Sequence, residues 1–327
     1  MLRTAAFACS VAVAAFSAKA DFIDFTVPGL ERPVHYFAAH AVEAGDSCRT
    51  ALVIVHGWGD GVRLPLEAPS FVEAATRLVG AANVPYVMAP VFPTKKTMAK
   101  FGQEDDGRAR WCDSLFAEGS TRCSPPDDWR GGGDAVGTSL SSFDVVDRIF
   151  ATLGDRTKYP NLTRVVLAGF SAGGQFAGRY AAVGKGVVRD GVTVDYAPMS
   201  PSTWIRLDED VLWHYGLKGK PRYSADCTKD RILANLSSRR QWNACGLKDV
   251  LRKPQTSLDS NPEAEAQGAN RYDRFEHFRD YVKGFPGWDG QSSFHVFSEL
   301  GHAYRKAYAD PAFVTFVCPK ETLSQSK

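Results

Sequence analysis

The chain has 327 residues, 44% of them hydrophobic, with 39 Lys and Arg against 37 Asp and Glu. This length and hydrophobic content suit one large α/β domain with a sizeable core. Because no basic block or stripe stands out, the charge pattern argues against nucleic acid as a partner.

The N-terminus has the features of a secretory signal peptide. Residues 1–3 give a basic start, an apolar Ala- and Val-rich stretch follows, and residues 17–20 end in a small-residue cleavage pattern. The apolar run is too short and too rich in Ala for a membrane anchor. We therefore expect cleavage after Ala20 and a mature domain over residues 21–327. The protein would be exported, either secreted or periplasmic, without a transmembrane anchor.

Apolar runs in the first third of the chain indicate strands. Residues 21–49 suggest one or two edge strands, and the β-branched run 51–55 is typical of a strand buried on both faces. A capping box at Ser70–Glu73 predicts a helix that runs to about Ala82. Residues 84–91 predict the next strand.

A long irregular stretch then interrupts the pattern. Residues 92–140 are rich in charge, Gly and Pro, and so long a stretch in a compact domain is usually functional or mobile. We interpret it as a loop insertion. The next helix is expected to be capped by Ser141 or Ser142 and to bury an apolar stripe within residues 146–153.

The rest of the chain alternates strands and helices. The predicted elements are a strand from about 163 to the turn at Ser171, a helix over 172–183, a strand over 192–196, a second insertion over 201–239, a strand over 241–247, a helix over 270–283, a strand over 294–297 and a terminal helix begun by Asp310-Pro311. This alternation predicts a mostly parallel sheet with helices on both faces. The insertion over 201–239 would lie above the carboxyl edge of that sheet.

The cysteine count points to disulfides. Seven cysteines are present, one of them in the signal peptide, and an even number in an exported chain suggests pairing. Short loops favour Cys112–Cys123 and Cys227–Cys245, which leaves Cys48–Cys318. The alternative is metal binding, but the sequence has no Cys-x2-Cys pair and no histidine at ligand spacing. We therefore expect neither a metal nor a cofactor.

Residues 165–175, Val-Val-Leu-Ala-Gly-Phe-Ser-Ala-Gly-Gly-Gln, place Gly-x-Ser-x-Gly after an apolar strand pattern. This is the form of a nucleophile elbow, in which a strand, a sharp turn at Ser171 and a helix follow one another. Gly169 and Gly173 would let the strand and helix backbones approach closely. The helix N-terminus would bring backbone N–H groups to an oxyanion. The alternative is an ordinary Gly-rich turn between a strand and a helix.

A serine nucleophile needs a base and an orienting carboxylate. His302 is the predicted base, because it follows a strand through Gly301 at the sheet edge that also carries Ser171. Asp249 is the predicted acid, because it ends the strand between the other two in chain order, although it could equally be a surface turn residue. The other acidic candidates lie within a strand or have no clear strand before them; they are Asp195, Asp230 and Asp259.

The order Ser171, Asp249, His302 after the loop His-Gly-Trp-Gly-Asp at 56–60 resembles the α/β-hydrolase superfamily. The resemblance is close at 170–175 and at the loop, and it covers nearly the whole mature chain at the level of strand order.

Two further stretches, Gln-Gly-Ala-Asn-Arg at 267–271 and Leu-Gly-His at 300–302, are similar to a poorly characterised group of exported members of that superfamily. The resemblance implies an α/β-hydrolase fold and an oxyanion hole at the backbone N–H groups of Trp58 and Ala172. It also implies that His56 orients its loop rather than acting as the base. The loop departs from the His-Gly-Gly-Gly of many lipases, because a bulky Trp stands in it.

The function that these features favour is a serine hydrolase of the carboxylesterase or lipase type, acting through an acyl-enzyme on Ser171. Its substrate would be a small-molecule or polymeric ester. An exported serine peptidase and a non-catalytic binding protein on the same fold are the alternatives. Five tryptophans could line an apolar acyl pocket or could equally be core or loop-anchoring residues; they are Trp58, Trp111, Trp129, Trp204 and Trp213.

Overall fold

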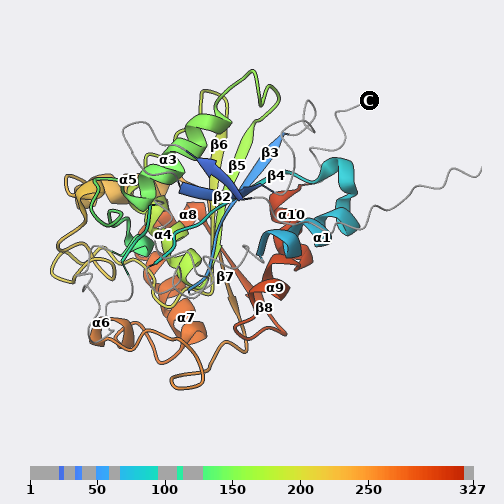
Figure 1. Cartoon of the computed structure of the whole chain (residues 1–327). Coiled ribbons are helices and arrows are strands. Elements are labelled where there is room, and N and C mark those ends of the chain that lie inside the picture. The colour runs from blue at the N-terminus through green and yellow to red at the C-terminus, as the bar shows by residue number, and fades with distance from the viewer. Residues whose placement is uncertain are drawn as a thin grey trace, which may run out of the picture.

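A computed structural model of the chain describes residues 49–58, 67–94, 109–112 and 128–319, together with the backbone of the strands at 22–25 and 34–38. The strands form an eight-stranded sheet in the order β1-β2-β4-β3-β5-β6-β7-β8 (Figure 1). They are β1 Phe22–Phe25, β2 Val34–Ala38, β3 Thr50–Val55, β4 Tyr86–Pro90, β5 Arg164–Phe170, β6 Thr193–Met199, β7 Gln241–Gly246 and β8 Ser292–Phe297. β1 is antiparallel to β2 and β2 to β4, whereas β4, β3, β5, β6, β7 and β8 are all parallel.

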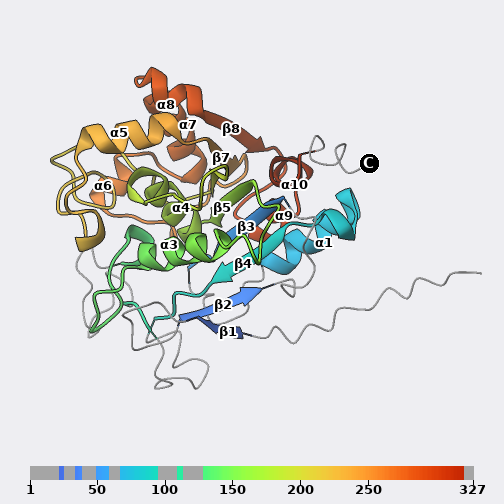
Figure 2. The same ribbon diagram turned by 90° about the horizontal axis from the view of Figure 1, so that it is seen from above.

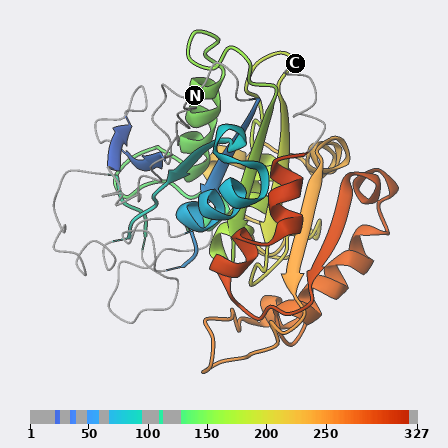
Figure 3. The ribbon, with the colours of Figure 1, turned by 90° about the vertical axis from the view of Figure 1, so that its right-hand side faces the viewer.

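Helices cover both faces of this sheet (Figure 2). On one face lie α3 Ser142–Leu153, α4 Ala172–Val183, α5 Lys229–Ser238, α7 Arg271–Val282 and α8 Pro286–Gln291. On the other face lie α1 Glu67–Val79, α9 Tyr304–Tyr308 and α10 Pro311–Val317, which stand in front of the sheet in Figure 3. The short helices are η2 Ala81–Asn83, η3 Trp129–Gly131, η4 Arg222–Ser224 and α6 Pro262–Glu265. The predicted mostly parallel sheet between two helical layers is therefore confirmed.

The central strands are apolar on both sides because both sides are covered. Every residue of β3 is buried, and its side chains alternate between the two layers. Val53 and Val55 join the core under α4, whereas Leu52 and Ile54 join the core under α1. This burial explains why the strand reads as a continuous apolar run rather than as an alternating one.

Most elements lie where the sequence predicts them. Ser141 caps α3 by accepting a hydrogen bond from Phe143 N–H and forms a capping box with Asp144. The predicted capping box at Ser70 is wrong, because α1 already begins at Glu67 and Ser70 lies inside it. The spacing of a Ser and a Glu within a helix imitates a helix start, and the packing of the preceding residues decides where the helix begins.

The segment 201–239 is not uniform. Its last part, residues 229–238, is α5, which connects the parallel strands β6 and β7 as a crossover helix. The irregular part, 201–228, is fixed to the helical layer by Trp213, whose indole N–H donates to the carbonyl of Gly131 at 2.8 Å.

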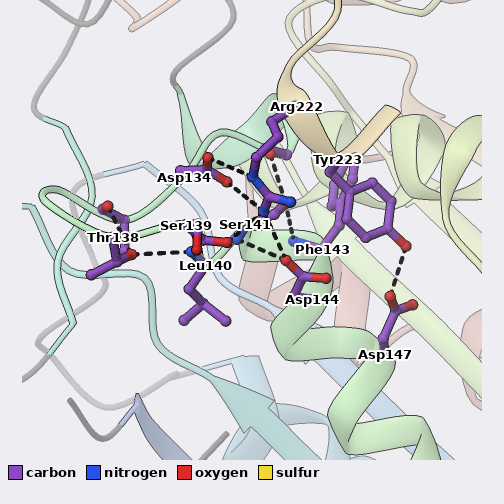
Figure 4. A network of polar contacts seen from close by, with 12 residues as sticks. Asp134, Thr138, Ser139, Leu140, Ser141, Phe143, Asp144, Asp147, Arg222 and Tyr223 are labelled. Carbon is purple, nitrogen blue, oxygen red and sulfur yellow. Dashed lines mark hydrogen bonds and ion pairs between the residues drawn. The ribbon is translucent and has the colours of Figure 1, made fainter. Parts of the chain in front are cut away.

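A polar network holds η4 against α3 (Figure 4). The Arg222 guanidinium donates to both carboxylate oxygens of Asp134 at 3.0 Å and to Asp144 at 3.2 Å. The Tyr223 hydroxyl donates to Asp147, further along α3, at 2.8 Å. These contacts anchor the irregular segment to α3.

The cysteine pairing differs from the prediction. Cys227 and Cys245 are both free thiols, so the predicted bridge between them is wrong. Cys245 lies in β7, within the sheet, whereas Cys227 lies just before α5 in the covering helical layer. A disulfide needs Cα atoms within about 7 Å, which a short sequence separation does not secure. Cys112 is disulfide-bonded. Cys48 and Cys123 lie outside the described residues, so their pairings stay predictions.

The predicted signal peptide and most of segment 92–140 also lie outside the described residues. Among the helices that the structure describes, none is both long and apolar enough to cross a bilayer.

Candidate active site

Ser171 occupies a sharp turn between β5 and α4. Its backbone has φ 57° and ψ −116°, a conformation that non-glycine residues rarely adopt and that is retained only where the surrounding structure imposes it. The surroundings do so here, because Ser171 N–H donates to the carbonyl of Met199 at the end of β6, at 2.9 Å. The turn lifts the Ser171 side chain out of the sheet at the N-terminus of α4.

The glycines around Ser171 are required by close backbone contacts. A Cβ on Gly169 would lie 2.1 Å from the carbonyl of Gly173, and a Cβ on Gly173 would lie 2.0 Å from the carbonyl oxygen of Val55. A Cβ on Gly174 would meet the carbonyl oxygen of Met199 at 2.5 Å. The start of α4 therefore packs directly on the ends of β3, β5 and β6, which fixes the position of Ser171.

The structure brings together the three residues that chain order singles out. His302 Nε2 lies 3.0 Å from Ser171 Oγ, and His302 Nδ1 lies 2.7 Å from Asp249 Oδ2. Because a carboxylate only accepts hydrogen bonds, Nδ1 carries the proton and Nε2 presents its lone pair to the serine hydroxyl. This is the arrangement in which an imidazole can take a proton from a serine.

Asp249 follows β7 and is almost fully buried, at 1% exposure. Its N–H donates to the carbonyl of Gly246 at 3.0 Å, and its carbonyl accepts from the N–H of Tyr272 on α7 at 3.2 Å. These backbone contacts define a turn that points the carboxylate inward, which rules out the alternative of a surface turn residue.

A buried arginine stands on the other side of Asp249. Arg271 Nη1 lies 3.7 Å from Asp249 Oδ1, an oxygen that makes no hydrogen bond. The guanidinium is held by Thr256 Oγ1 at 3.0 Å and Ser202 Oγ at 3.2 Å. Sequence reasoning assigned no role to Arg271. A charged residue at the first position of a helix is usually exposed, and nothing in the pattern indicates that this one is buried.

His302 is neutral at ordinary pH. Burial lowers the pKa of His302 below its usual 6.5 and the positive charge of Arg271 lowers it further, while the hydrogen bond to Asp249 opposes both. The imidazole also packs against Phe170, with ring centroids 4.8 Å apart. A neutral imidazole facing a hydroxyl has the protonation state that a general base requires.

The loop after β3 is held by His56. Its Nδ1 donates to the carbonyl of Gly57 at 2.7 Å, and its Nε2 accepts from the N–H of Phe92, after β4, at 3.0 Å. Burial lowers the pKa of His56 to about 4. Because one ring nitrogen bonds the loop and the other bonds the segment after β4, His56 has a structural position. Gly57 N–H is held in turn by Glu67 at 3.2 Å.

Trp58 and Ala172, the two expected oxyanion-hole residues, both border one pocket with Ser171. Ala172 is the first residue of α4, so its N–H has no partner within the helix and lies at the positive end of the helix dipole. An anion formed on a substrate bound at Ser171 would therefore meet a favourable field.

The pocket beside Ser171 has a volume of about 270 Å³, and most of the residues that line it are polar. Among the described residues, Trp58, Ala172 and Leu258 are its apolar lining. The other four tryptophans named above are no more than 4% exposed and do not border it, so the core interpretation holds for them. In the described part of the chain, the tryptophans therefore do not build an apolar acyl pocket beside Ser171.

The remaining acidic candidates do not approach His302. Asp195 on β6 is paired with Arg164, whose Nε donates to it at 2.7 Å, and Asp230 is exposed on α5. Asp259 borders the pocket but accepts from the Tyr215 hydroxyl at 2.9 Å. In the part of the chain that the structure describes, no cluster of three or more His, Cys, Asp or Glu is arranged to hold a metal ion.

Solved structures with a similar fold include several hydrolases. The structure matches a poly(3-hydroxybutyrate) depolymerase from Bordetella parapertussis with a TM-score of 0.64 and 17% identity, over 91% of this chain and 90% of that one. A poly(aspartic acid) hydrolase from Sphingomonas sp. KT-1 matches with a TM-score of 0.65 and 18% identity, over 91% and 98%. An S-formylglutathione hydrolase from Agrobacterium tumefaciens matches with a TM-score of 0.50 and 10% identity, over 91% and 94%. No protein-family model matches the sequence, and no curated protein is detectably similar to it. At these identities the likeness establishes the fold.

Proposed function

We propose that this chain, which has the α/β-hydrolase fold, is a serine esterase that cleaves a carboxylic ester through an acyl-enzyme on Ser171. The observation that carries the proposal is the hydrogen-bonded series Ser171–His302–Asp249 at the N-terminus of α4. One strained serine here meets a base, an orienting carboxylate and a helix N-terminus. This arrangement is suited to acyl transfer.

In the proposed mechanism, Ser171 Oγ attacks the ester carbonyl while His302 Nε2 takes the hydroxyl proton. Asp249 keeps the imidazole in the tautomer with Nδ1 protonated and stabilises the imidazolium that forms. The oxyanion is placed between the backbone N–H groups of Ala172 and Trp58. His302 then gives its proton to the leaving alkoxide, and a water molecule repeats the steps to release the acid.

An ester is the proposed substrate class, small or polymeric, because an alkoxide leaves more easily than an amine. A serine peptidase would use the same residues, so a panel of esters and peptides separates the two. A binding protein on this fold would have no reason to hold a neutral imidazole 3.0 Å from a serine hydroxyl in a strained turn. We also propose that the protein is exported after cleavage at Ala20, which N-terminal sequencing of the mature protein tests.

A fluorophosphonate probe tests the catalytic proposal directly. The parent chain should be labelled at Ser171 and should hydrolyse short-chain esters, whereas the Ser171→Ala variant should do neither while keeping its circular dichroism spectrum. Unlabelled parent protein, or a Ser171→Ala variant with turnover near that of the parent, would disprove the proposal.

A further inference from the structure

Among the described residues, the pocket beside Ser171 is surrounded by more positive than negative charge. Arg130 and Lys253 border it, and Arg179 lies behind it, one helical turn beyond Gln175 on α4. Against these three cations stand two carboxylates. Asp128 pairs with Arg130, and Asp259 lies in the pocket wall. The excess of one positive charge contrasts with the near balance of the chain as a whole.

Arg130 is placed to reach a ligand. Its side chain is 12% exposed, and its guanidinium lies over the Trp58 ring, 4.8 Å from the centroid. Asp128 engages Nε and Nη2 of this guanidinium, while Nη1 has a long contact of 3.5 Å with Gln175 Oε1. Gln175 lies one turn after Ser171, so Nη1 is a weakly occupied donor on the Ser171 side of the pocket.

Arg179 has no counter-ion among the residues that the structure describes. It is buried, and its donors go to the Thr203 hydroxyl at 2.9 Å and to the carbonyls of His214 and Arg130 at 3.1 and 3.3 Å. No carboxylate among the described residues lies within ion-pair distance of it. Burial lowers the pKa of Arg179 to about 9, and Arg130 lowers it too, which leaves Arg179 protonated at neutral pH. A buried charge without a partner is costly, and an anion in the pocket would offset it.

Lys253 supplies a cation at the mouth of the pocket. It is exposed, and its ammonium group donates to Ser260 Oγ at 3.0 Å, which leaves two N–H donors. The negative wall residue Asp259 is already engaged, since it accepts from the Tyr215 hydroxyl and from Asn261 N–H at 2.9 and 3.1 Å. Among the charged groups that line this pocket, Arg130 and Lys253 therefore keep N–H donors that are open to a ligand.

We propose that this pocket binds the acid part of the substrate and that this part carries a second carboxylate, which Arg130 and Lys253 bind. The acid part is the one that stays bonded to Ser171 Oγ in the acyl-enzyme, and Ser171 forms one wall of this pocket. The inference rests on the proposed esterase function and narrows its substrate to half-esters of dicarboxylic acids or to polymers of such units.

The test compares two esters that differ only in charge, mono-p-nitrophenyl adipate and p-nitrophenyl hexanoate. We expect kcat/KM for the adipate ester to be about tenfold or more higher than kcat/KM for the hexanoate ester, the factor that a charge-assisted hydrogen bond supplies. Lys253→Gln should reduce this ratio at least about threefold, mainly through KM. The paired variant Arg130→Gln/Asp128→Asn should reduce the ratio further while leaving no buried carboxylate unpaired. Lys306→Gln, on α9 at the opposite face, should leave both rates unchanged.

A binding measurement separates this inference from the esterase proposal. Titration calorimetry on the Ser171→Ala variant should show mono-p-nitrophenyl adipate binding more tightly than p-nitrophenyl hexanoate, with an affinity that falls as NaCl rises. Equal binding of the two esters, or a ratio of rates that Lys253→Gln does not change, would overturn the inference even if ester hydrolysis is observed. Preferential adipate binding by a chain that hydrolyses neither ester would support the pocket and reject the esterase.

Discussion

Asp249→Asn tests how the carboxylate sets the state of His302. In the parent chain, Asp249 Oδ2 accepts from His302 Nδ1 at 2.7 Å, while Oδ1 faces Arg271 Nη1 at 3.7 Å. An asparagine must turn either its oxygen or its NH2 group toward that cation. The oxygen is the favourable choice, which leaves the NH2 group facing His302. The imidazole must then carry its proton on Nε2, where it cannot accept one from Ser171.

We expect the Asp249→Asn variant to lose about four orders of magnitude in kcat, the loss that a wrong tautomer produces in such a site. Turnover of a p-nitrophenyl ester measures this, and thermal unfolding shows whether the fold persists. Asp230→Asn, at an exposed position on α5, is the control and should stay near the parent rate.

Adding Arg271→Met to Asp249→Asn should let the amide oxygen turn back to His302 and recover part of the loss. An Asp249→Asn variant within roughly tenfold of the parent would refute the tautomer argument, and a double variant no faster than the single one would refute the role of Arg271.

Four further outcomes follow from the same structure. Gly173→Ala should destabilise the fold by about 1–3 kcal/mol or more, because its Cβ would lie 2.0 Å from the Val55 carbonyl oxygen. Gly178→Ala, also in α4, should instead raise the melting temperature, because its Cβ would meet no atom closer than Pro198 Cβ at 3.8 Å. In the parent chain, the pKa of His302 is lowered below 6.5, and Arg271 is one of the causes. In the Arg271→Met variant, the acid limb of the profile of kcat/KM against pH should therefore move to higher pH. An acid limb at the same pH as in the parent would count against this coupling. Thiol titration of the unfolded, unreduced chain should find at least two reactive cysteines, and finding none would restore the fully paired arrangement.

The part of the site that the sequence predicts consists of residues at strand ends. Ser171, Asp249 and His302 each follow a strand of the parallel sheet, and the carboxyl ends of parallel strands share one edge of the sheet. Chain order and three local patterns were therefore enough to place them together. No long-range information beyond the parallel sheet was needed.

The charged residues around these three could not be predicted in the same way. Arg271 starts a helix, and Arg130 lies in a 3-10 turn within an irregular stretch. An arginine in either context is exposed in most proteins. Its burial here depends on which distant segments pack over it, and the hydrophobic periodicity of the sequence does not indicate those segments. The predicted Cys227–Cys245 bridge was wrong for a similar reason, because sequence distance does not say that one thiol lies in the sheet and the other in the helical layer that covers it.

Arg271 changes what Asp249 can do for the imidazolium in the proposed mechanism. Before substrate binds, the charge of the buried Asp249 carboxylate is already balanced by Arg271 beside it. It therefore stabilises a protonated His302 less than an unpaired carboxylate would. Burial lowers the pKa of His302 and Arg271 lowers it further, which keeps the base neutral down to lower pH at the expense of basicity. When the imidazolium forms, the charge that balances it is the substrate oxyanion at Ala172. The pairing of Arg271 with Asp249 thus favours charge separation only when a substrate is present to carry the negative charge.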